Sequence, residues 1–119
     1  MAEELTEQEL HNLAMNVVGK DLEKNGFEFM AVNSKLKKDP QFVCLKDKKL
    51  HFIIVRAVLY PENPSEINYL FMETIKEHAT KFKASTYYAG VGIANASDYE
   101  KPVNKEQNYI IKYDGIIKI

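Results

Sequence analysis

The segment from His51 to Tyr60 constrains the fold of this chain more than any other part of the sequence. It reads His-Phe-Ile-Ile-Val-Arg-Ala-Val-Leu-Tyr, so apolar side chains would point to both faces of a strand whose one fixed charge is Arg56. Strands that are apolar on both faces belong to the interior of a sheet covered on both sides. We therefore expect a strand over residues 50–60 in the middle of a sheet that has helices on both faces.

Two amphipathic helices are predicted to provide that cover. The first runs from about Thr6, its N-cap, to Asn25, and Glu9 completes a capping box. The second begins at Pro64, its first helical position, and has Asn63 as its N-cap. Apolar residues recur at helical spacing in both segments: Leu10, Leu13, Ala14, Val17, Val18 and Leu22 in the first, and Ile67, Leu70, Phe71, Ile75, Ala79 and Phe82 in the second.

Shorter segments are expected to complete the sheet. Gly90 and Gly92 indicate a bulge or a close approach of another backbone segment, and Asp114-Gly115 favours a terminal hairpin. The predicted strands are residues 27–31, 41–46, 50–60, 86–95 and 109–113, with a hairpin return over 116–119. The order α-β-β-β-α-β-β predicts an α/β (α+β) fold with a central mixed sheet flanked by two helices, in one domain over residues 1–119.

The composition argues against several classes of protein. The chain has 119 residues, 45% of them hydrophobic, which is enough apolar material for one domain with its own core. Its net charge of -1 disfavours nucleic-acid binding by electrostatics alone. A single cysteine, Cys44, excludes an internal disulfide and an all-cysteine metal site. No apolar stretch approaches the roughly 20 residues that span a bilayer, and the first residues are acidic, unlike a signal peptide. We expect a soluble cytoplasmic domain with no cofactor and no membrane contact.

Two segments, Leu22–Asn33 and Pro40–Ala57, carry a pattern that resembles a known fold. The first resembles the helix end and first strand of small bacterial endonuclease-like proteins of the PD-(D/E)xK, or restriction-endonuclease-like, fold. The second resembles the catalytic hairpin of these proteins. In that family one strand of the hairpin carries Pro-Asp, and the next carries Glu-x-Lys about a dozen residues later. The resemblance implies the same fold, and the order of predicted elements is compatible with it.

The motif positions hold residues unsuited to its chemistry. The resemblance places Gln41 at the Asp position, Ile54 at the Glu position and Arg56 at the Lys position. In the family the carboxylates hold a divalent cation at the scissile phosphate, and the lysine helps to polarise the attacking water. Glutamine is a weak ligand and isoleucine cannot bind a hard cation. We therefore predict no catalytic residue and no metal site at this hairpin. The alternative is a relocated carboxylate, with Asp39, Asp47, Glu28, Glu73 and Glu77 as candidates.

Positive charges around the hairpin leave two interpretations open. Arg56 could contact an anion, because a guanidinium grips phosphate or carboxylate in two places, or it could form a structural ion pair, which we favour. Lys46, Lys48 and Lys49 could extend the anion contact. The wider segment, residues 33–50, holds six lysines and two aspartates. These lysines could lead an acidic partner toward the sheet edge, or they could simply keep an edge strand soluble, which is the commoner role.

Three functions are consistent with these features. The first is a non-catalytic nuclease-fold domain that binds an unidentified protein partner or a second copy of itself. The second is a metal-dependent nuclease with relocated carboxylates. The third follows from the element order, which also resembles that of secretion chaperones, dimeric modules that hold a partner peptide. We favour the first. The hairpin pattern at residues 40–57 separates it from the third, a response to metal ions would separate it from the second, and a stable dimer would favour the third.

Overall fold

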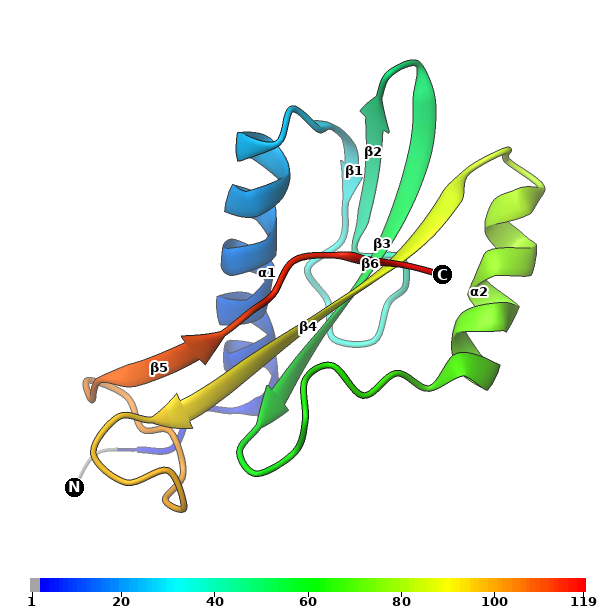
Figure 1. Cartoon of the computed structure of the whole chain (residues 1–119). Helices are drawn as coiled ribbons and strands as arrows, with labels where there is room; N and C mark the ends of the chain where they lie inside the picture. Colours follow the sequence, from blue (N-terminus) through cyan, green and yellow to red (C-terminus); the bar gives the residue numbers. More distant parts are fainter. Residues whose placement is uncertain (1–2) are drawn as a thin grey trace.

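The computed structural model describes residues 3–119 and confirms the predicted order of helices and strands (Figure 1). The elements are α1 (Glu7–Lys24), β1 (Glu28–Val32), β2 (Phe42–Lys46), β3 (Lys49–Leu59), α2 (Tyr69–Thr80), β4 (Ser85–Asn95), β5 (Tyr109–Lys112) and β6 (Ile117–Lys118). Within residues 3–119, no helix is both long and apolar enough to cross a membrane. Residues 3–119 thus form an α+β domain with two helices and one sheet.

The six strands form a single mixed sheet in the order β1-β2-β3-β4-β5, and β6 also pairs with β4. Strands β1, β2 and β3 form an antiparallel meander. Strands β3 and β4 run parallel over nine residue pairs, from His51↔Ser85 to Leu59↔Ile93. The segment around residues 50–60 is thus an interior strand, as its two apolar faces predict, and α2 is the crossover that a parallel pair needs.

The helices cover opposite faces of the sheet (Figure 1). Helix α1 packs against β3 and β4, and α2 packs mainly against β4. The smaller core, on the α2 side, is formed by Ile54, Met72 and Tyr88. The larger core, on the α1 side, contains thirteen buried residues: Leu10, Ala14, Met15, Val18, Leu22, Phe42, Cys44, Ile53, Val55, Ala89, Val91, Ile93 and Val103.

The start of α1 is as predicted, whereas the start of α2 is not. The Thr6 side chain accepts a hydrogen bond from the Glu9 amide at 3.1 Å, and the Glu9 carboxylate accepts one from the Thr6 amide at 3.0 Å, which completes the capping box. Helix α2 begins five residues later than expected, because Asn68 and not Asn63 is its N-cap. The Asn63 side chain instead accepts a hydrogen bond from the Ser65 amide in a turn.

A close approach of two backbone segments explains this later start. Pro64 is buried against β4, and a Cβ atom at Gly90 would lie 1.9 Å from the Pro64 carbonyl oxygen. The prediction that these glycines mark a close backbone approach is therefore confirmed at Gly90. Because residues 61–67 are needed to reach across β4 at this point, the helix can begin only after them.

The predicted terminal hairpin is wrong. Strand β6 pairs with β4, through Tyr87↔Lys118 and Tyr88↔Ile117, and not with β5. Strand β4 has eleven residues and β5 only four, so part of the β4 edge is left for the chain end. Both short strands are antiparallel to β4, and the chain therefore keeps its direction through Asp114-Gly115 instead of reversing there.

Candidate functional site

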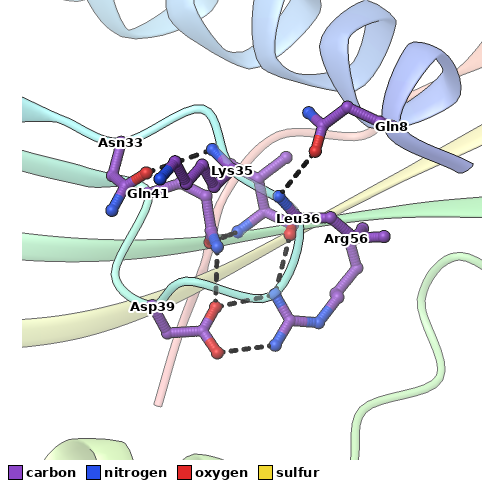
Figure 2. Close-up of polar contacts among 8 residues, drawn as sticks. Gln8, Asn33, Lys35, Leu36, Asp39, Gln41 and Arg56 are labelled. Carbon is purple, nitrogen blue, oxygen red and sulfur yellow. Dashed lines mark hydrogen bonds and ion pairs between the residues drawn. The ribbon is translucent and has the colours of Figure 1, made fainter.

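Arg56, in β3, is part of a two-point ion pair with Asp39 (Figure 2). The two terminal guanidinium nitrogens donate to the two carboxylate oxygens at 2.7 and 2.8 Å. One of them also donates to the Val55 carbonyl oxygen at 3.0 Å, and the guanidinium carbon lies 5.4 Å from the centre of the Phe71 ring. The Arg56 and Asp39 side chains are 21% and 11% exposed. Of the two interpretations of Arg56, the structure therefore shows the structural ion pair.

Gln41 joins this pair to the sheet. Its side-chain nitrogen donates to an Asp39 oxygen at 2.8 Å, and its side-chain oxygen accepts from the Val55 amide at 2.8 Å. Gln41 is fully buried, and one further step of the β2–β3 register places it opposite Ile54. The position at which the resemblance expects a metal-binding carboxylate is thus occupied by an amide that satisfies a backbone donor in the core.

The loop that carries Asp39 is held against α1 by side-chain hydrogen bonds. The Gln8 side chain accepts from the Leu36 amide at 3.0 Å and donates to the Ser34 carbonyl at 2.8 Å. The Asn33 side chain accepts from the Lys35 amide at 3.1 Å. Figure 2 shows the contacts of Gln8 with Leu36 and of Asn33 with Lys35, in the loop from which Asp39 reaches Arg56.

The three motif positions come together, but the alternative carboxylates do not. Ile54 is fully buried in the core on the α2 side, and Asp39 is occupied by Arg56 and Gln41. Over residues 3–119, no three His, Cys, Asp or Glu side chains are grouped so that they could hold a metal ion. The remaining candidates are spread over three parts of the chain: Glu28 is in β1, Asp47 is in the β2–β3 turn, and Glu73 and Glu77 are both in α2.

The predicted anion-contact residues lie at opposite ends of β3. Lys46 and Lys49 face each other across the β2–β3 turn, with Lys48 between them. Arg56 lies seven residues beyond Lys49 along the same strand, which corresponds to about 23 Å at roughly 3.3 Å per residue. The lysines therefore do not form one binding site with Arg56, and any role that they have lies elsewhere.

A buried histidine lies near the ion pair. His11, in α1, is fully buried, and among residues 3–119 neither of its ring nitrogens has a hydrogen-bond partner. Burial lowers the pKa of His11, and the Arg56 charge lowers it further while Asp39 opposes the shift. Burial by itself would raise the pKa of Asp39, but the hydrogen bonds from Arg56 and Gln41 outweigh it and the pKa is lowered. Both groups thus resist protonation in the folded protein.

We predict that the free energy of unfolding falls as the pH is lowered from 7. A group whose pKa is lower in the folded state binds more protons when unfolded, so acid favours unfolding. For His11 the loss begins near its unfolded pKa of about 6.5, and for Asp39 it follows near 4. Denaturant titrations of the variant His11→Leu should lack the first of these losses. The variant should also be more stable at pH 7 by about 1 kcal/mol, because it removes a buried polar group that has no partner. An unchanged pH profile would contradict the prediction.

The most exposed apolar segment of the sheet is its edge strand β1. All five of its residues are exposed, and Phe29, Met30 and Val32 have exposed fractions of 38%, 56% and 56%. Strand β2 pairs with one edge of β1, and no other hydrogen bond within residues 3–119 reaches the β1 backbone. The sequence pattern predicted a strand here, but its exposure depends on the sheet order, which the pattern does not reveal.

These features define a class: an α+β domain with an Arg–Asp ion pair beside the β2–β3 hairpin and an exposed apolar strand at one edge of its sheet. The family model "Domain of unknown function (DUF8840)" matches residues 8–119. The chain belongs to that family. A search of curated proteins and a search of solved structures each gave no match.

Proposed function

We propose that this chain is a non-catalytic binding module, built on a nuclease-like scaffold without its metal site, that accepts an extended segment of a partner protein along β1. The observation that carries the proposal is the exposed edge of β1. We place the domain in the cytoplasm, where the lone thiol of Cys44 stays reduced.

The edge of β1 has the properties of a strand-accepting surface. An extended peptide that joins a sheet edge gains main-chain hydrogen bonds, and its alternate side chains contact the side chains of the edge strand. Four of the five β1 residues are apolar, and the strand has neither lysine nor proline, the residues that commonly protect an edge. A bulge between Phe29 and Ala31 and the charge of Glu28 protect the strand in part, and both leave Met30 and Val32 exposed.

The interior supports a binding role over a catalytic one. The charges of Arg56 and Asp39 are directed at each other, so neither is free to bind a phosphate or to activate water. Burial raises the pKa of Cys44 to about 11, which leaves almost no thiolate at neutral pH. The side chains with which a nuclease or a cysteine enzyme would work are therefore used in holding the structure together.

A pair of matched variants tests the proposal. The probe is a fluorescein-labelled peptide with blocked ends and the sequence Thr-Val-Thr-Val-Thr, and binding is followed by fluorescence anisotropy. We expect saturable binding to the wild-type protein and at least about a tenfold loss, or about 1.4 kcal/mol, in the double variant Met30→Lys, Val32→Lys. Lysines on an edge strand oppose pairing with a further strand.

The control introduces the same charge elsewhere. Tyr69 and Leu70 of α2 are 62% and 86% exposed, so the double variant Tyr69→Lys, Leu70→Lys changes two large hydrophobic residues that are even more exposed and lie away from β1. This control should bind the peptide as the wild type does. Absence of saturable binding to the wild type, or equal loss in both double variants, would refute strand addition at β1.

A further inference from the structure

Exposed lysines lie beyond both ends of β1. Lys35, Lys37 and Lys38 are in the loop that directly follows the strand, and all three are exposed. At the other end, Glu28 pairs with Leu45, so the strand begins beside the β2–β3 turn. The lysines of that turn region are Lys46, Lys48 and Lys49, and the Lys46 ammonium lies 4.7 Å from the centre of the Phe27 ring, directly before β1.

The positive charge is partly neutralised at the turn end, where Asp47 and Glu28 lie beside three lysines, and less so at the loop end. Of the two aspartates in residues 33–50, Asp39 is paired with Arg56 and Asp47 lies in the lysine-rich turn. The one charge within β1 itself is Glu28. The strand is about 17 Å long at roughly 3.3 Å per residue. The surface therefore consists of a short apolar edge between two positive ends.

We infer that the segment bound at β1 is an acidic-flanked strand of another protein: an apolar or β-branched core of about five residues with glutamate or aspartate on both sides. This inference rests on the proposed function. Opposite charges at the two ends would fix the position of the segment along the edge and speed its association. Because the lysines lie outside the strand, they leave the edge itself open.

The same charges disfavour two other occupants. A second copy of this chain, paired about a two-fold axis, would place β1 antiparallel to its partner strand and the lysine-rich loop of one copy beside the lysine-rich turn of the other. Like charges so placed repel. A nucleic acid would need a continuous basic track with stacking aromatic side chains, whereas here an apolar strand separates the two positive ends.

Three peptides with one core separate the contribution of charge from that of the edge. Each has the core Thr-Val-Thr-Val-Thr and carries three glutamates, three serines or three lysines on both sides. In about 0.05 M salt we expect the glutamate-flanked peptide to bind about tenfold more tightly than the serine-flanked one, as several exposed ion pairs would give. At roughly 0.5 M salt, screening should remove most of that difference.

Charge reversal shows whether the lysines at β1 are responsible. The variant Lys35→Glu, Lys49→Glu changes one lysine at each end of β1 and should lose the preference for the glutamate-flanked peptide. The control Lys76→Glu, Lys81→Glu changes two exposed lysines in and directly after α2 and carries the same net charge. It should keep the preference.

The outcomes distinguish the inference from the proposed function. Equal binding of all three peptides that is still lost in Met30→Lys, Val32→Lys would overturn the acidic partner and leave strand addition intact. Binding that is insensitive to that double variant would overturn both. If both charge-reversal variants lost the preference for the glutamate-flanked peptide equally, the preference would come from the overall charge of the protein and not from the lysines beside β1. This result would overturn the inference. If an equal concentration of a short oligothymidine strand displaced the glutamate-flanked peptide, the inference would be overturned, because the occupant of this surface would then be a nucleic acid and not a protein segment.

Discussion

Replacement of Gly90 by alanine should cost about 3 kcal/mol of the free energy of unfolding, at the upper end of the range for overpacked sites. The new Cβ atom would lie 1.9 Å from the Pro64 carbonyl oxygen and 2.8 Å from the Tyr88 ring. The closest of these atoms belongs to the backbone, so either β4 or the segment before α2 must move. Thermal unfolding should therefore occur at a temperature at least roughly 10 °C lower for a domain of this size.

Gly19, in the interior of α1, is the matched control for Gly90. A Cβ atom there would lie 3.5 Å from the Phe42 ring, an ordinary contact, so Gly19→Ala should stabilise the protein by about 0.5–1 kcal/mol through helix propensity. If the melting temperature of the Gly90→Ala variant lay within a degree or two of the wild-type value, Pro64 would not approach β4 as closely as described.

Replacement of Arg56 by methionine should also destabilise the protein strongly, by about 2–4 kcal/mol. The change leaves Asp39 mostly buried and without its cation, and loss of one partner of a fully buried pair costs about 3–5 kcal/mol. We expect a smaller loss than for a fully buried pair, because the Arg56 side chain is 21% exposed. Denaturant titration at pH 7 gives the value directly.

A double-mutant cycle separates the pair from its neighbours. Asp39→Asn keeps an oxygen that can accept the hydrogen bond from Gln41, but it removes the charge that Arg56 needs. The variant with both changes should be more stable than the sum of the single losses predicts, by about 1–3 kcal/mol, because no charge is then left without a partner. Additive losses would show that the two charges do not stabilise each other.

The sequence was sufficient for the elements that depend on local patterns. The capping box at Thr6 and Glu9 fixes the start of α1, and the two apolar faces of residues 50–60 require an interior strand. The start of α2 could not be predicted, because Asn63 is as good an N-cap as Asn68, and the choice depends on the contact of Pro64 with a strand some 25 residues away. The terminal hairpin failed for a similar reason, since the free length of β4 decides where the last residues pair.

The candidate site was partly visible in the sequence. The resemblance drew attention to Gln41, Ile54 and Arg56 as motif positions. The sequence did not reveal that Asp39 is the partner of Arg56, because the fold of the loop before β2 brings the two side chains together. The lysines were recognised as a charged group, whereas their positions at the two ends of β1 depend on the β1–β2 register. Register and loop geometry are long-range properties that composition and periodicity do not contain.

The most direct test of the central claim is amide hydrogen exchange of the protein with and without the glutamate-flanked peptide. A peptide strand added to β1 would form hydrogen bonds with backbone amides of Glu28–Val32, which now pair on one edge only. We predict slower exchange within this segment and little change in α2 or β5. Protection confined to another surface, with Glu28–Val32 unchanged at saturating peptide, would contradict the account.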